Sequence, residues 1–172
     1  KSEHLLLNFV SSHDENAWAG TVEELYGEAA HTMMALNYTS PGLPFLYSGV
    51  EYDLNKRLLF FEKDSFPKVK GETYDLLKKL GELKNTRAAL NSGREPGKYT
   101  PIKTSLLEKV LAFERTKEGD TIVFIGNMSG EHIGFRSPYN GTFKRFKDEK
   151  TKRLSYSYEY RMKPWEFWIL KN

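Results

Sequence analysis

Two nearly continuous apolar runs, each followed by a helical pattern, dominate the first half of the chain. The runs cover residues 4–10 and 43–47, and such runs are typical of strands that are buried on both faces of a parallel sheet. Between them, apolar residues recur at helical spacing, and Thr21 with Glu24 has the spacing of a capping box. The pattern therefore predicts an amphipathic helix over residues 21–37.

A polar loop follows the second run, from Ser48 to about Lys70, and leucines then recur at helical spacing through Leu83. This spacing predicts a second helix. Two successive strand and helix units give parallel strands with right-handed crossovers, as in a TIM barrel or a doubly wound sheet. Two strands complete neither fold, and they leave apolar edges exposed. We therefore expect a piece of a larger fold that self-associates through these edges.

The second half of the chain has the short spacing and alternation of antiparallel strands. Residues 109–115 and 121–125 flank a turn and predict a hairpin. Tyrosines alternate with polar residues over 154–162, and residues 164–170 predict a last strand. We expect a small antiparallel β-sandwich of about six to eight strands.

Charge and turn residues separate the two halves. Residues 1–92 carry 10 basic and 13 acidic groups, a net charge of −3, whereas residues 93–172 carry 16 and 10, a net charge of +6. A cluster rich in Gly and Pro at residues 91–97 lies where the charge changes. We place a domain boundary near Ser92, with an incomplete α/β domain over 1–92 and a β-domain over 93–172.

Composition excludes several classes of protein. No apolar run approaches the roughly 18 residues that span a bilayer, cysteine is absent, and the four histidines have no metal-binding spacing. We predict no membrane partner and no structural metal. Acidic Asp148 and Glu149 interrupt the basic residues between Lys144 and Arg153, so a solvated hairpin is preferred over a nucleic-acid surface. The sequence assigns no localisation.

Functional groups in parallel α/β folds lie just past the carboxyl ends of the strands. In this chain those positions are residues 11–16 and 48–57, and His13 and Asp14 come directly after the first apolar run. From position alone, a role for Asp14 or Asn16 in capping a turn and a surface role for His13 are preferred over catalysis. Position by itself does not identify a catalytic residue.

Two motifs change this interpretation. Phe-Val-Ser-Ser-His-Asp-Glu-Asn at residues 9–16 resembles the last conserved block of the α-amylase family of glycoside hydrolases. Ser-Pro-Gly-Leu-Pro-Phe-Leu-Tyr-Ser-Gly-Val-Glu at residues 40–51 is similar to the eighth barrel strand of that family, and residues 56–64 resemble its bacterial members. The sequence departs from the family at Ser12, where Asn is common, and at Val50, where Gln is frequent.

The resemblance implies the last two strand and helix units of a (β/α)8 TIM barrel, followed by the C-terminal β-domain. It implies a retaining glycosidase for α-linked glucans, in which His13 binds the sugar at the cleavage site and Asp14 stabilises an oxocarbenium-like transition state. The nucleophile and the acid would come from upstream strands, so we expect the isolated chain to be inactive. The resemblance allows calcium in the full-length enzyme, and no cofactor is expected in this chain.

Three further residues are candidates for contacts at the barrel top or with sugar, namely Trp18, Tyr47 and Glu51. For Trp18, packing on the predicted first helix is preferred over stacking on a sugar. Trp165 and Trp168 are expected mainly in the sandwich core. The alternative function is a noncatalytic carbohydrate-binding or structural module in which the β-domain is the working part.

Overall fold

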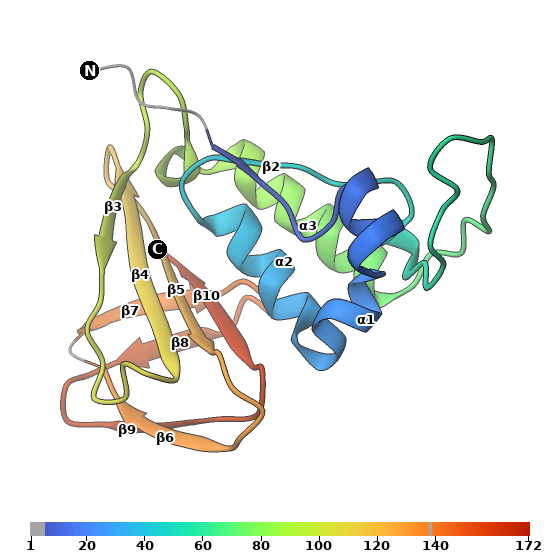
Figure 1. The fold of residues 1–172 in the computed structure, drawn as a ribbon. Coiled ribbons are helices and arrows are strands. Elements are labelled where there is room, and N and C mark those ends of the chain that lie inside the picture. Colours follow the sequence, from blue (N-terminus) through green and yellow to red (C-terminus); the bar gives the residue numbers. More distant parts are fainter. Residues whose placement is uncertain (1–5, 138) are drawn as a thin grey trace. The chain divides into compact units, whose positions relative to one another are not determined.

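The computed structural model describes residues 6–137 and 139–172, and these fall into two compact units that divide between Thr86 and Arg87 (Figure 1). His4 and Leu5, where the first predicted strand begins, lie outside the described residues. The first unit contains β1 (Leu7–Asn8), η1 (Glu15–Ala19), α1 (Val22–Tyr26), η2 (Gly27–Ala29), α2 (Ala30–Thr39), β2 (Leu43–Pro44), η3 (Val50–Tyr52) and α3 (Glu72–Thr86). The second contains η4 (Ala88–Leu90), β3 (Lys98–Pro101), β4 (Val110–Lys117), β5 (Asp120–Asn127), β6 (Ile133–Arg136), β7 (Gly141–Arg145), β8 (Thr151–Leu154), β9 (Glu159–Met162) and β10 (Phe167–Lys171). The predicted domains over 1–92 and 93–172 stay a prediction.

β1 and β2 pair in parallel, as the sequence predicts, with Leu7 opposite Leu43. Gly42 permits their close approach: it has a φ of +114°, and a Cβ there would lie 2.6 Å from the Leu6 carbonyl oxygen. The prediction that the first strand is buried on both faces is wrong, since Leu6 is 63% and Leu7 58% exposed. The reason is that β2 is the strand partner of β1 among the described residues, and two strands cover little surface.

The predicted helix over residues 21–37 forms as two α-helices with a short 3-10 helix between them. α1 begins with the predicted capping box, in which the Thr21 hydroxyl accepts the Glu24 N–H and the Glu24 carboxylate accepts the Thr21 N–H. Gly27 ends α1 with a φ of +47°, a conformation that glycine adopts readily. The prediction of one continuous helix is therefore wrong at Gly27.

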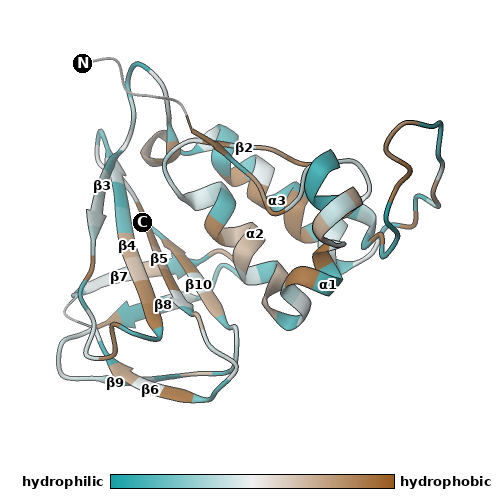
Figure 2. Ribbon diagram, viewed as in Figure 1, coloured by the Kyte–Doolittle hydropathy of each residue, from teal (hydrophilic) through white to brown (hydrophobic). Residues whose placement is uncertain are grey.

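α3 forms where the leucine spacing predicts a helix, and Figure 2 shows apolar and polar residues along different sides of it. Its buried residues are Thr73, Leu77, Leu80 and Leu83. The Thr73 hydroxyl donates to the Asp53 carboxylate and lies 2.7 Å from His31 Nε2. These contacts connect the start of α3 to α2 and to the end of η3.

The second unit has antiparallel strands throughout its described residues, as the sequence predicts. β3, β4, β5, β10, β7 and β8 form a six-stranded sheet in this order, and β6 pairs with β9 in a second sheet (Figure 1). The predicted β4–β5 hairpin closes with Glu118 and Gly119, both at positive φ. Two such residues match the twist of the flanking strands.

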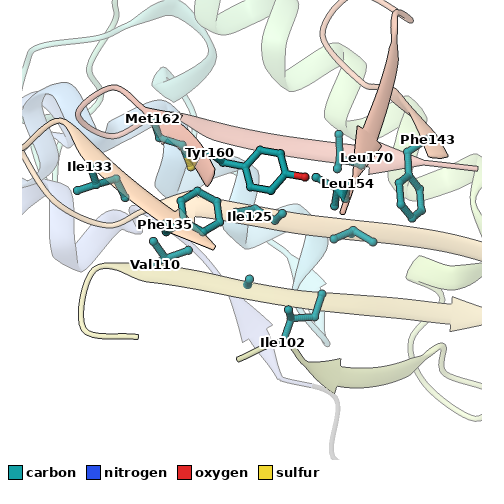
Figure 3. Close-up of a cluster of buried hydrophobic side chains, with 12 residues drawn as sticks. Ile102, Val110, Ile125, Ile133, Phe135, Phe143, Leu154, Tyr160, Met162 and Leu170 are labelled. Atoms are coloured by element: carbon teal, nitrogen blue, oxygen red, sulfur yellow. The ribbon is translucent and has the colours of Figure 1, made fainter. Parts of the chain in front are cut away.

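The hydrophobic core of this unit joins its two sheets (Figure 3). Phe135 of β6 is 1% exposed, and its ring centroid lies 5.8 Å from that of Tyr160 on β9 and 6.3 Å from that of Trp168 on β10. The six-stranded sheet contributes Val110, Ala112, Val123, Ile125, Phe143, Leu154 and Leu170. Each fully buried aliphatic or aromatic side chain contributes about 1.5–3 kcal/mol to folding.

The segment that precedes β3 belongs to the second unit because polar side chains of the sheet hold it. Arg87 forms an ion pair with Asp120. The guanidinium of Arg115, which is fully buried, donates to the carbonyl of Asn91 at 2.9 Å and to that of Gly97 at 3.2 Å. The Gly and Pro cluster at residues 91–97 is therefore bound to the sheet of the second unit.

The alternation over residues 154–162 extends across a turn, and the prediction that the last strand begins near residue 164 is wrong. Residues 154–162 do not form one strand, because a turn separates β8 from β9 and the Ser155 N–H in that turn donates to the Tyr160 hydroxyl at 2.7 Å. The last strand begins at Phe167 rather than near residue 164, since Trp165 has a φ of +52°, which does not continue a strand.

Candidate functional site

His13 and Asp14 follow β1 and form the first helical residues, directly before η1. Ser12 builds this helical turn: its hydroxyl accepts the Glu15 N–H at 3.2 Å, and its carbonyl accepts the Asn16 N–H at 2.9 Å. The Asp14 side chain makes no capping hydrogen bond to η1. Ser12, where the sequence departs from the family pattern, therefore has the capping role that position alone suggested for Asp14.

The two residues form an exposed polar pair. His13 Nε2 lies 3.5 Å from Asp14 Oδ2, and the side chains are 64% and 63% exposed. A carboxylate can accept two O–H donors at once, and an imidazole offers a further donor or acceptor. The pair can therefore bind neighbouring hydroxyl groups of a polyol, although the catalytic role of Asp14 and the sugar-binding role of His13 stay predictions.

An aromatic cluster adjoins this pair, and we call it the Phe60 cluster: His13, Trp18, Phe60 and Phe61. The Phe60 ring centroid lies 5.4 Å from that of His13, 5.4 Å from that of Trp18 and 4.7 Å from that of Phe61. Trp18 is 66% exposed and Phe61 86% exposed. η1 thus supplies Trp18 and the loop after η3 supplies Phe61, and both exposed rings lie against Phe60, which contacts His13.

Asn16 binds the backbone of this loop. Its side chain is buried, its amide nitrogen donates to the Lys56 carbonyl at 3.2 Å, and its amide oxygen accepts the Leu58 N–H at 2.7 Å. Both ends of one side-chain amide therefore bind the backbone of a segment about forty residues away in sequence. Asn16 sets the position of Phe60 relative to His13.

Charged side chains hold the rest of the loop. Arg57 donates to the Glu24 carboxylate at 3.0 Å and to the Ala19 carbonyl at 3.3 Å. The backbone N–H of Thr21 together with Arg57 lowers the pKa of Glu24. These contacts join the loop to η1 and to the start of α1.

Asp64 closes the loop on itself. The Lys56 ammonium binds its carboxylate, which also accepts the N–H groups of Leu59 and Ser65. These donors stabilise the charged carboxylate and lower the pKa of Asp64 to about 2. The segment that contains Phe60 and Phe61 is therefore held in one conformation by charge-assisted hydrogen bonds.

The three further candidates have different surroundings. Trp18 lies against Phe60, and two thirds of its surface is exposed. The preferred prediction, that Trp18 packs on the first helix, is therefore wrong for most of this side chain. The Glu51 carboxylate accepts the Gly49 N–H at 2.9 Å, and the Tyr47 carbonyl accepts the Val50 N–H at 3.2 Å. Those bonds shape the turn after β2, and sugar contacts for Tyr47 and Glu51 stay predictions.

The expected functional stretches, residues 11–16 and 48–57, include Asn16 and Arg57, but sequence reasoning assigned neither of them to the site, and it did not identify Phe60 or Phe61. Asn16 and Arg57 act through partners distant in sequence, so no local pattern marks them. The four consecutive apolar residues 58–61 inside the predicted loop are a usable signal, since exposed apolar side chains that cluster in a loop often mark a binding surface.

The second unit carries a separate polar cleft of about 600 Å³. It is lined by His132, Ile133, Gly134, Glu159, Arg161, Met162, Lys163 and Glu166.

The Trp168 indole N–H donates to Glu166 at 2.8 Å, and the Lys152 ammonium lies 4.0 Å from the Trp168 ring centroid. Burial, with Arg145 nearby, lowers the pKa of Lys152. Trp168 therefore packs in the core, and its position gives little support to a carbohydrate-binding surface in this unit.

Within the described ranges, 6–137 and 139–172, no three His, Asp or Glu side chains come together as metal ligands would. The helices in those ranges are also too short or too polar to traverse a bilayer.

Three solved structures show what this fold is similar to. A maltogenic α-amylase, AmyB from Thermotoga neapolitana, matches 98% of this chain at a TM-score of 0.81 and 19% identity. The α-amylase of Lactobacillus plantarum matches 98% at a TM-score of 0.73 and 13% identity. The α-amylase of Geobacillus thermoleovorans, complexed with acarbose, matches 97% at a TM-score of 0.68 and 21% identity.

The chain spans 41% of the Thermotoga enzyme and 38% of each of the other two. No family model and no curated protein matches the sequence. The likeness therefore concerns the fold, and the resemblance that the two motifs carry is confirmed at that level: the chain has the fold of a portion of an α-amylase-family glycoside hydrolase.

Proposed function

We propose that the chain is the C-terminal portion of an α-amylase-like retaining glycoside hydrolase that acts on α-linked glucans such as starch and maltooligosaccharides. The observation that carries the proposal is the structural match over 98% of the chain to an α-amylase, at a TM-score of 0.81. In this assignment β1 through α3 are barrel strand seven through helix eight, and the second unit is the C-terminal β-domain.

In the proposed mechanism His13 and Asp14 hold the sugar at the cleavage site. The Asp14 carboxylate accepts two hydroxyl groups, and these hydrogen bonds strengthen as the ring flattens and positive charge develops at the anomeric carbon. Asp14 is then a stabiliser of the transition state rather than the nucleophile. The position of the pair just past the carboxyl end of β1 and its exposure to solvent support this role.

Retaining hydrolysis also needs a nucleophilic carboxylate and a carboxylic acid about 5 Å apart. We assign both to upstream strands of a longer protein, so the 172-residue chain alone is expected to be inactive. The described residues offer no cluster that would hold calcium, and calcium in the longer protein stays a prediction. The exposed apolar residues of β1 and β2 would then meet upstream strands or, in the isolated chain, a second copy.

The test is a release assay on soluble starch and maltooligosaccharides, with the 172-residue chain and the longest natural chain that contains it. We expect activity in the longer chain alone, and a fall of about a hundredfold or more in kcat for its Asp14→Asn variant at unchanged thermal stability. A longer chain that is inactive on every α-glucan, or indifferent to Asp14→Asn, would contradict the proposal. Glucan binding that depends on Trp165 would then favour the noncatalytic module.

A further inference from the structure

The Phe60 cluster exposes more aromatic surface than its loop needs in order to fold. Phe61 is 86% exposed and Trp18 is 66% exposed. Adjacent exposed aromatic rings in a soluble protein mark a surface that meets a ligand or another protein segment. Both rings lie against Phe60, and the Phe60 ring also contacts His13, which favours a ligand of the same site.

The loop is also ordered by bonds that do not bury these rings. Asn16 binds it through both ends of its amide, Arg57 binds η1 and α1, and Asp64 closes it. Ordering such a segment costs conformational entropy. Several polar contacts thus keep the exposed rings in fixed positions. A preorganised binding surface requires such an arrangement.

The three aromatic residues of the loop and η1 have different positions in the cluster. Phe60 is half-buried in the middle, with a ring tilted 33° from that of His13, 45° from that of Trp18 and 73° from that of Phe61. Its ring is therefore largely covered by its neighbours. Trp18 and Phe61, at the outside, keep ring surface that faces solvent.

We infer that Trp18 and Phe61 form a stacking surface for a glucosyl unit adjacent to the one that His13 and Asp14 hold, and that Phe60 positions both rings. The inference rests on the proposed function. The C–H face of a pyranose is apolar and similar in size to an aromatic ring, so stacking removes apolar surface from water on both sides. The ligand class is an α-linked glucan long enough to extend past the cleavage site.

The experiment compares KM and kcat for maltotriose through maltoheptaose in the longest natural chain, with Phe61→Ala, Trp18→Ala and the double variant. Val69→Ala is the matched control, because Val69 is also an apolar residue of this loop and is 70% exposed. We expect KM to rise about tenfold for the longer oligosaccharides in each single variant, which corresponds to about 1.4 kcal/mol. The shortest substrates and the control variant should change less than twofold.

Two variants of Phe60 separate positioning from direct contact. Phe60→Leu should raise KM for the longer substrates as Phe61→Ala does, because both outer rings lose their support. Phe60→Tyr keeps the ring and should restore KM to within about twofold of wild type. Failure of Phe60→Tyr to restore KM, with its thermal stability unchanged, would contradict the positioning role.

The outcomes distinguish the inference from the proposed function. An active longer chain whose KM is unchanged at every length in the double variant overturns the stacking surface and leaves the glycosidase proposal standing. A double variant that lowers the melting temperature with KM unchanged overturns it too, and identifies the rings as packing for upstream barrel segments. A wild-type longer chain that is inactive on all α-glucans overturns both.

Discussion

The strands of the two units differ in what covers their apolar side chains. In the first unit Leu6, Leu7 and Leu43 are between 44% and 63% exposed, although they lie in or next to the only parallel strand pair of the described residues. In the second unit Val123 and Leu170, on neighbouring central strands, are fully buried. The same types of residue thus end in opposite environments.

The difference follows from sheet architecture rather than from composition. An antiparallel sheet folds back on itself through short turns, so one contiguous segment can build both of its layers. A parallel strand needs neighbours brought by crossovers, and a single pair cannot surround its own side chains. The second unit is therefore expected to be stable by itself, whereas the first unit depends on what covers β1 and β2.

The largest expected effect comes from replacing a phenylalanine by alanine at a buried position and, for comparison, at an exposed one. Phe135→Ala should lower the free energy of unfolding by about 4 kcal/mol, because it removes a fully buried ring from the core between the sheets. Phe61→Ala is the matched control, with an 86% exposed ring, and should change it by less than about 0.5 kcal/mol. Urea unfolding followed by circular dichroism measures both, and equal losses would contradict the contrast.

Arg115→Met tests where the second unit begins. Loss of the buried guanidinium leaves the carbonyls of Asn91 and Gly97 without this donor, and we expect a cost of about 3 kcal/mol. Hydrogen exchange over residues 87–97 should accelerate before exchange in β4 does. Arg136→Met, at an exposed position, is the control. Unchanged exchange over 87–97 would show that this segment is held by other contacts.

Much of the fold could be predicted from the sequence because local signals and tertiary context agree there. The capping box at Thr21, the leucines of α3 and the Glu118-Gly119 hairpin each form as predicted. The wrong predictions occur where one residue overrides a pattern. Gly27 interrupts a helical period, and Trp165 at positive φ delays the last strand. Periodicity reports which residues face a core, and it does not report where the backbone turns.

The site could be predicted only in part. His13 and Asp14 stand next to a predicted strand, so their place at its carboxyl end follows from the sequence. Phe60 reaches them through a loop whose course depends on Asn16, Arg57 and Asp64, and the contacts of Asn16 and Arg57 join residues far apart in the chain. Nothing in a local pattern specifies such a loop conformation, which is why the aromatic cluster required the structure.

Asn16→Ala sharpens the comparison within the first unit, where polar side chains hold the loop after η3. The variant loses the hydrogen bonds to Lys56 and Leu58, and at about 1 kcal/mol each we expect a loss of about 2 kcal/mol. The effect should be local, with faster proteolysis in residues 56–65 and unchanged protection in β4 and β5. Asn85→Ala, at an exposed position on α3, is the control. Protection lost equally in both units would contradict a local role for Asn16.

The smallest expected effect concerns the stability of the same loop at low pH. Asp64 has a pKa of about 2 in the folded chain, below the value of about 3.9 for an unfolded chain. Its contribution is therefore complete above about pH 4 and is lost as the pH falls towards 2. Amide chemical shifts of Leu59 and Ser65 should titrate with a midpoint near 2. Lys56→Met should move this midpoint upwards, because it removes the strongest stabiliser of the carboxylate. A midpoint near 4 in the wild-type chain would mean that Asp64 does not close the loop.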